Sequence, residues 1–329
     1  MAQFAGLALA GPALGAPELA QGAATPTARD GRILRVGPAR RLKRPAEAAR
    51  AACDGDTIEI DAGNYRGDAA VWTRHGLTIR AVGGPVRLLA EGAAAEGKAI
   101  WVVRATGLRI EGIEFAGARV PTGNGAGIRF EAGSLVLERC RFLDNEMGVL
   151  TAGRPDMALA VHHCEFADAP RHDSGLLHHL LYVGAIGSCV VMHSRFHHGW
   201  RGHLINSRAR VNRILFNELD NGDDGGASYE LEFPDGGDAP VLGNRLVQSA
   251  ASHNPAMLSM GAEGARPGAD AAGRLHRLVL RGNRFVNHRP DAPDAPSRFV
   301  HLWPERLAGP LVVDAEGNVF DGPGVVGLP

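Results

Sequence analysis

The chain has 329 residues and a formal net charge of −1, with 44 glycines and only 5% aromatic residues. A charge this close to zero gives no case for nucleic acid or an acidic membrane surface as a partner, and without 18 consecutive apolar residues no membrane insertion is expected. The many glycines and the short apolar runs are instead typical of numerous short strands separated by turns.

Residues 1–30 are apolar at first, then rich in alanine, glycine and proline, and they lack a basic stretch. Small residues in ALGA and AQGA offer cleavage sites of the kind found after export signals, so this segment is predicted to be a leader or the remnant of such a signal. Export would place the protein in the periplasm or outside the cell. The alternative is a disordered leader that has no targeting role.

Residues 31–55 are predicted to form an N-terminal cap. Pro45 suits the first turn of a helix, and the AEAARAA run after it contains good helix formers, with a stop expected at Asp54-Gly55. The segment TIEIDAG then alternates apolar and polar residues as a strand does. A short helix in this place would shield the open backbone edge of the first of several stacked coils.

Residues 56–329 are predicted to form one repetitive domain, in which a short phrase recurs between residues 109 and 320: an alternating strand, a small or amide residue, any residue, and then Phe or Leu. A base period in the low twenties with variable insertions predicts a solenoid. Stacked amides can hydrogen-bond along such a stack, and the following Phe or Leu forms a second internal ladder. The key position of the phrase, two residues before the Phe or Leu, is occupied in turn by Ile113, Cys140, Cys164, Ser194, Asn217, Asn244, Asn283 and Asn318.

The four cysteines have neither a CxxC motif nor the spacing of zinc ligands. They are predicted to be unpaired, buried small residues. Because Cys140 and Cys164 occupy the same turn of successive coils, they are expected one strand spacing apart without a bond between them.

The cap, AEAARAACDGDTIEIDAGNY, and the recurring N-x-F/L turns resemble the right-handed parallel β-helix of the pectate-lyase-like superfamily, over about residues 45–329. The resemblance implies an all-β fold: a single-stranded right-handed parallel β-helix of roughly nine to ten coils with a short N-terminal capping helix. It also implies three strands per coil, with substrate lying across the sheet made by the first strands. One fold hosts many chemistries, so function must be argued from residues on that sheet.

Side-chain alternation sorts each first strand into inward and outward residues. It places Tyr182, Asn206 and Glu232 side by side in one outward row, flanked by Arg208 and Glu230. A register slip of one residue would invert this assignment. The first strands are expected at 127–130, 148–152, 179–184, 203–209, 229–234, 257–262 and 299–304.

Glu230 and Glu232 are candidate metal ligands. Two like charges two residues apart on one face repel each other unless a cation stands between them. Calcium prefers carboxylate and carbonyl oxygens, so Ca²⁺ is the candidate cofactor. The neighbouring acidic loop, DNGDDGG, lacks the regular spacing of a calcium loop and is expected to be a solvated loop.

Five arginines precede the acid-rich segment between Ile214 and Asn244. Arg208 is the one that shares the outward face, and it is the candidate for binding a substrate carboxylate. A guanidinium can grip a uronate carboxylate through two hydrogen bonds. The alternative is that these arginines pair with the acids that follow them. Arg201, His178, Asn206 and Trp303 are the candidate substrate-binding residues, although Trp303 could equally pack near the end of the solenoid.

Six histidines lie between residues 178 and 203, and no pair has the spacing of a known metal motif. Most are expected to be surface or turn residues. His203 opens a predicted first strand and is therefore the candidate proton acceptor.

The strand pair GHLINSRARVNRILFN and SYELEFPDGG is similar to the calcium-assisted alginate and chondroitin lyases. The similarity implies that Glu230 and Glu232 match the calcium-holding carboxylates and that Arg208 could match the arginine. Where those enzymes place a lysine base, this chain has Asn206, and a neutral amide cannot act as a base. His203 or Tyr182 would have to take that role.

The predicted function is therefore action on an acidic, uronate-containing polysaccharide by removal of the C5 proton, followed by β-elimination (a lyase) or epimerisation. One alternative is a non-catalytic polysaccharide-binding solenoid that works in exopolysaccharide handling. Another is a glycoside hydrolase, which would need two carboxylates at a set separation. The sequence leaves the oligomeric state open.

Overall fold

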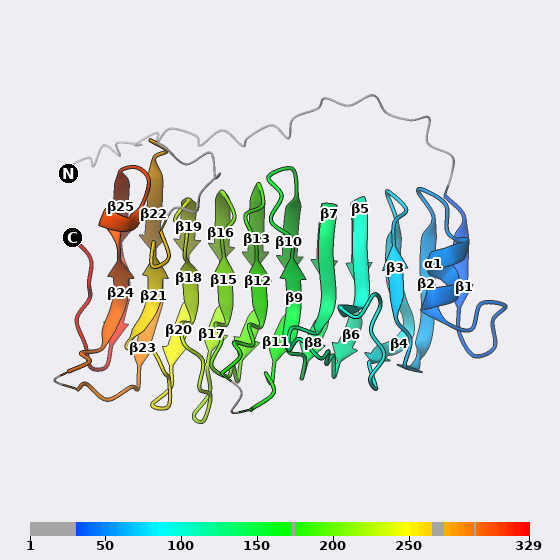
Figure 1. The fold of residues 1–329 in the computed structure, drawn as a ribbon, viewed down its shortest axis with the longest axis horizontal. Helices are drawn as coiled ribbons and strands as arrows, with labels where there is room; N and C mark the ends of the chain where they lie inside the picture. The colour runs from blue at the N-terminus through cyan, green and yellow to red at the C-terminus, as the bar shows by residue number, and fades with distance from the viewer. Residues whose placement is uncertain (1–30, 173–174, 265–272, 293) are drawn as a thin grey trace, which may run out of the picture.

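The computed structural model describes residues 31–172, 175–264, 273–292 and 294–329, so the predicted leader lies outside the described residues. Twenty-six strands form one continuous sheet in which all the paired strands run parallel. Figure 1 shows the coils standing side by side along the long axis, from the blue N-terminal cap to the red C-terminal end. The predicted all-β parallel β-helix is confirmed.

The N-terminal end is covered by α1 (Pro45–Ala51), which has Pro45 in its first turn and buries Pro45 and Ala48. The predicted helix is confirmed, and it ends at Ala51, three residues before the expected stop. It packs on β1 (Ile33–Val36), β2 (Thr57–Arg66) and β3 (Ala70–Trp72). An additional strand that the sequence did not predict, β1, pairs with β2 and adds a rung in front of the expected first strand.

Three ladders of parallel strands run along the molecule, named here in the order in which the chain visits them within a coil. The first ladder contains β3, β5 (Ala99–Glu111), β7 (Ala126–Glu138), β9 (Met147–Thr151), β12 (Leu181–Val183), β15 (Ile205–Ser207), β18 (Leu231–Phe233), β21 (Ala256–Met260) and β24 (Arg298–Leu302). Its strands from β7 onward coincide with the predicted first strands.

The second ladder contains β1, β2, β4 (Thr78–Leu89), β5, β7, β10 (Ala158–His162), β13 (Ser188–Met192), β16 (Val211–Leu215), β19 (Asp238–Leu242), β22 (His276–Arg281) and β25 (Leu311–Glu316). The third ladder contains β2, β4, β6 (Ile113–Ala116), β8 (Arg141–Leu143), β11 (Glu165–Ala167), β14 (Arg195–His197), β17 (Glu218–Asp220), β20 (Arg245–Gln248), β23 (Arg284–Asn287) and β26 (Val319–Asp321). Strands shared by two ladders are long strands that continue around a corner of the coil.

The turn between the second and third ladders carries the predicted stack of amides. Backbone N–H groups of Asn217, Asn244 and Asn283 donate to the side-chain oxygen of the asparagine in the next coil, at 2.8–3.0 Å. The Nδ2 group of Asn244 donates back to a carbonyl of the preceding coil, and the other asparagines repeat this contact. Buried backbone groups at this turn therefore keep hydrogen-bond partners in every coil.

A column of stacked apolar side chains from the third ladder fills the interior, as predicted. The rings of Phe115, Phe142, Phe166 and Phe196 stack with centroids 4.6–5.1 Å apart. Each such pair contributes about 0.5–1.5 kcal/mol beyond the area that it buries. The column continues in register through Leu219, Leu246, Phe285 and Phe320.

All four cysteines are free, as predicted. Cys140 and Cys164 are neighbours in the turn stack: the backbone N–H of Cys140 lies 3.3 Å from Sγ of Cys164. Cys189 is also buried, but Cys53 is exposed, because it lies in the turn that follows α1. The expectation of burial was therefore wrong for Cys53.

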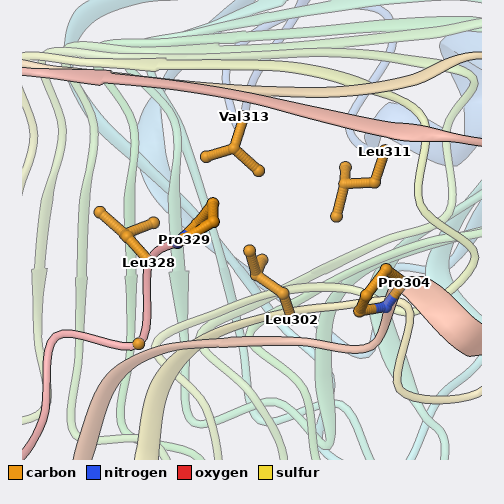
Figure 2. Close-up of a pocket in the computed structure, with 7 residues that line it drawn as sticks. Leu302, Pro304, Leu311, Val313, Leu328 and Pro329 are labelled. Carbon is orange, nitrogen blue, oxygen red and sulfur yellow. The ribbon is translucent and has the colours of Figure 1, made fainter.

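The C-terminal end of the solenoid carries an apolar hollow of about 460 Å³. Figure 2 shows how Leu302, Leu311 and Leu328 line it together with Pro304, Val313 and Pro329. Among the described residues, those that line the hollow are apolar or glycine. Within the described part of the chain, no helix is both long and apolar enough to cross a membrane.

Candidate functional site

Four neighbouring strands of the first ladder present one row of outward side chains. Tyr182 on β12 pairs with Asn206 on β15, Asn206 pairs with Glu232 on β18, and Glu232 pairs with Ser259 on β21. His301 on β24 continues the row. The predicted register of Tyr182, Asn206 and Glu232 is therefore confirmed, and adjacent members lie one strand spacing apart.

A histidine, a carboxylate and an amide meet at the centre of this row. Nδ1 of His203 lies 2.9 Å from Oε2 of Glu232. Nδ2 of Asn206 lies 2.7 Å from the same oxygen and 2.9 Å from Nδ1 of His203. All three residues are buried. Asn206 is thus a partner of the histidine–carboxylate pair, and its contact with substrate stays a prediction.

His179 also belongs to this group, although the sequence analysis did not single it out. Its Nδ1 accepts the backbone N–H of His203 at 3.0 Å, so the ring proton sits on Nε2. Its ring centroid lies 4.7 Å from that of His203 and 5.3 Å from that of Tyr182. Burial lowers the pKa of His179 well below its ordinary value, so this ring is neutral and links the two candidate catalytic residues.

Arg208 ties the row to two acids. Its guanidinium contacts Oδ1 of Asp235 and Oε1 of Glu263 at 2.6 Å each, and its Nε donates to the Tyr182 hydroxyl at 3.1 Å. Burial works to lower the pKa of Arg208, but the bond to Glu263 and the charges nearby outweigh it and raise the pKa. Arg208 therefore pairs with acids that follow it in the sequence, which was the alternative to binding a substrate carboxylate.

Glu230 does not lie on the outward row, and the prediction that it does was wrong. It is fully buried, and by register it lies between Leu204 and Met257, two residues of the hydrophobic core. Neither of its carboxylate oxygens has a hydrogen-bond partner among the described residues. Burial raises the pKa of Glu230 well above its ordinary 4.5, which favours the uncharged form of the group.

The expected alternation fails at Glu230 because β18 begins only at Leu231. Before that residue the backbone is still turning, so two successive side chains, Glu230 and Leu231, are both buried. Tyr229 faces His203 instead, with ring centroids 5.1 Å apart.

The predicted pair of calcium ligands therefore does not fit this arrangement. A hard cation takes several oxygen ligands, and the strand neighbours of Glu230, Leu204 and Met257, offer no side-chain oxygen. Glu232, the other member, is already engaged by His203 and Asn206.

The remaining predicted contact residues lie at the edges of the row. His178 is buried, with its ring packed 4.0 Å from that of His172, and its contact with substrate stays a prediction. Trp303 stacks on His301 at 4.0 Å and lies under the Arg306 guanidinium, which corresponds to the packing alternative. Arg201 is half-buried in the turn that leads to His203, and its contact with substrate stays a prediction.

One signal in the sequence points to both His179 and the inward position of Glu230. The first strands open as His179-Leu180-Leu181, as His203-Leu204-Ile205 and as Tyr229-Glu230-Leu231. Aligned in this way, the first positions of the three coils are ring-bearing residues that share the site. Glu230 aligns with two core leucines.

The geometry defines a parallel β-helix that carries a buried histidine–glutamate pair on its first ladder. In comparisons with known proteins, no family model matches the chain, and neither does any curated protein.

Proposed function

We propose that this protein is a carbohydrate-active enzyme of the pectate-lyase-like type that removes the C5 proton from a uronate unit of an acidic polysaccharide. The observation that supports the proposal most directly is the 2.9 Å contact between His203 and Glu232. It lies on the first ladder, the sheet that carries substrate in the superfamily that the sequence resembles.

His203 is the base. When its Nδ1–H donates to Oε2 of Glu232, the lone pair is left on Nε2, which is the atom that accepts a proton. The glutamate orients the ring and stabilises the imidazolium that forms. Asn206 donates a second hydrogen bond to the same oxygen and holds the carboxylate in place.

Tyr182 is the acid. Arg208 donates to the phenol oxygen, so the hydroxyl's own proton is available for donation elsewhere. In elimination, the C5 proton moves to Nε2 of His203, the C5–H electrons form the C4–C5 double bond, and the departing O4 takes the proton of Tyr182. In epimerisation, a proton returns to C5 from the opposite face of the ring and no bond in the chain breaks.

The uronate carboxylate binds at Arg208 by exchange of partners. The Glu263 side chain is 48% exposed, whereas that of Asp235 is 13% exposed. A substrate carboxylate can therefore take the place of Glu263 on the guanidinium while Asp235 stays in contact. A bidentate guanidinium–carboxylate pair fixes the sugar ring and withdraws charge from its carboxylate.

Incubation of the purified protein with a panel of polyuronates tests the proposal. A lyase produces an unsaturated sugar that absorbs in the ultraviolet. An epimerase produces no absorbance but exchanges the C5 proton with deuterated water, which nuclear magnetic resonance detects. Activity of either kind supports proton abstraction, and its absence with every polymer overturns it.

The burial of His203, Asn206 and Glu232 favours a second candidate, a non-catalytic polysaccharide-binding solenoid in which the same network only stabilises the sheet. Saturable binding of a polyuronate, with neither absorbance nor deuterium exchange, is the result expected from that candidate.

A further inference from the structure

Beyond the outward row, a second cluster of histidines lies at the ends of two neighbouring strands of the third ladder, β11 and β14. β11 and β14 pair in register, Glu165 with Arg195 and Ala167 with His197. The next residue of each strand, Asp168 and His198, therefore also lie in adjacent coils, and the N–H of Ala169 donates to the carbonyl of His198 at 3.1 Å.

Three side chains of this cluster turn toward one point. Nδ1 of His197 lies 2.6 Å from Nδ1 of His198, and Nδ1 of His198 lies 3.6 Å from Oδ1 of Asp168. One atom from each of the three residues lies within 4.8 Å of the others.

The contact that Nε2 of His197 makes with Glu165 fixes the tautomer of the ring. Nε2 lies 3.0 Å from Oε1 of Glu165, so it carries the proton and donates it to the carboxylate. Nδ1 of His197 then presents a lone pair to Nδ1 of His198. Nδ1–H of His198 can donate to that lone pair, and a metal ion can take the place of this shared proton between the two rings.

We propose that Asp168, His197 and His198 bind a divalent transition-metal ion of the zinc class. Imidazole nitrogens with one carboxylate oxygen are a ligand set that zinc, iron and nickel accept, and hard cations such as calcium do not favour it. The Glu165–His197 contact completes a carboxylate–histidine–metal arrangement, in which the carboxylate fixes the tautomer of the ligand. At metal–nitrogen distances of about 2.0–2.1 Å, two ligand nitrogens stand about 3.0–3.4 Å apart. The two Nδ1 atoms therefore need to move apart by less than about 1 Å to admit the ion.

The site is open on one side. A hollow of about 370 Å³ adjoins it, lined by Asp144, Asp168, Pro170, Arg171, His198 and Asp224. Two of these acids already pair with arginines, Asp144 with Arg119 and Asp224 with Arg171. The three protein ligands therefore leave at least one coordination position toward the hollow, which is the pattern of a site that holds an exchangeable ligand.

This inference does not depend on the proposed function. None of its ligands belongs to the outward row, and none lies on the first ladder. The two proposals can therefore fail separately.

Zinc binding by the untagged, full-length protein tests the site. After treatment with a chelator and dialysis, the protein is titrated with Zn²⁺ in a calorimeter, and with Co²⁺ while the visible spectrum is recorded. We expect one equivalent of Zn²⁺ to bind and the Co²⁺ bands to appear. His198→Ala should weaken binding by at least about 100-fold, because even outer partners of metal ligands contribute about 10- to 100-fold.

His193→Asn is the matched control. His193 is exposed, lies in the coil of His198 at the opposite end of β14, and stacks between His163 and Phe216. Asparagine tolerates its left-handed backbone, φ 51°. Zinc affinity should stay unchanged in this variant.

Asp168→Asn is the second variant, chosen because the Asp168 side chain is 58% exposed and asparagine keeps its size, so the fold is expected to stay intact. It should also lower zinc affinity, with an unchanged circular dichroism spectrum. The inference is overturned if the wild-type protein binds no Zn²⁺, or if binding survives in both His198→Ala and Asp168→Asn.

Discussion

Two histidine–glutamate pairs lie within one coil of each other, and they differ in which nitrogen the glutamate holds. Glu232 contacts Nδ1 of His203 at 2.9 Å, whereas Glu165 contacts Nε2 of His197 at 3.0 Å. The opposite nitrogen of each ring is thus free for another task. In His203 that nitrogen is Nε2, at the far end of the ring. In His197 it is Nδ1, which faces His198.

The surroundings of the two pairs separate their chemistry. The pair with Glu232 is nearly closed to solvent and has an amide, a neutral histidine and a tyrosine as neighbours, which suits the movement of a proton. The pair with Glu165 has a second imidazole and a carboxylate at ligand distance and adjoins a hollow, which suits a metal. The same two residue types thus suit different chemistry in the two places, because the strand position decides which groups surround each pair.

Replacing the proposed base gives the largest expected effect. His203→Ala should lower kcat/KM on the active polyuronate by about 10²–10⁴-fold, the usual contribution of a positioned base. Zinc affinity should not change. Initial rates over a range of pH give the measurement, and the limb of the wild-type profile that reports the base should disappear.

His193→Asn serves again as the control, because its exposed ring touches neither pair. Equal activity of His203→Ala and the wild-type protein would assign proton abstraction to another residue and leave the pair with Glu232 a structural contact.

Removing the proposed acid has a smaller effect and separates the two proton transfers. Tyr182→Phe deletes the hydroxyl that Arg208 contacts but keeps the ring. Chain cleavage should fall by about 10²-fold, since the leaving oxygen loses its proton donor. Exchange of the C5 proton with deuterated water should fall less, because His203 is untouched. A parallel loss of both signals would contradict the assignment of acid and base.

Replacing the glutamate of the other pair, Glu165, is expected to change metal affinity. Glu165→Gln keeps the size of the side chain and removes the charge that fixes the His197 tautomer. Zinc affinity should fall by about 10- to 100-fold, as for outer partners of metal ligands in general. Competition with a chromophoric chelator measures this change. The polyuronate activity of the variant should equal that of the wild-type protein, and a loss there would couple the two sites.

The fold and the row could be predicted because both follow from repetition. The N-x-F/L turns fix where each coil turns, and stacked coils bury what one coil cannot. Once the turns were aligned, the alternation of each first strand gave the register of Tyr182, Asn206 and Glu232 that the structure shows.

What the sequence did not predict depends on backbone that departs from a regular strand. Glu230 was placed outward by an alternation that holds only from Leu231 onward. The cluster of Asp168 and His198 lies just beyond the ends of β11 and β14, so neither residue follows an alternation rule. Their proximity requires the register of the third ladder, which histidine spacing along the chain does not reveal.

Glu230, unlike Glu165 and Glu232, is not paired with a histidine in the described part of the chain. Its replacement has the smallest expected effect, and that effect is on stability. Glu230→Met should raise the free energy of unfolding at neutral pH by about 1–3 kcal/mol, since the buried polar group has no partner and methionine matches its neighbours in the core. Burial raises the pKa of Glu230 above its unfolded value of 4.5, so above that pH the unfolded chain releases a proton that the folded chain keeps. Wild-type stability therefore falls as pH rises from about 4.5 toward the folded pKa.

Urea unfolding at about pH 5 and about pH 8 measures this difference, because the advantage of Glu230→Met should grow with pH. Glu230→Gln is the matched control: it keeps an unpartnered polar group but cannot ionise, so it should remove the pH dependence and recover only part of the stability. An advantage of Glu230→Met that is equal at both pH values would mean that the carboxyl is ionised in the folded protein. A cation or a basic group would then have to lie against Glu230, and the contrast with the paired glutamates would disappear.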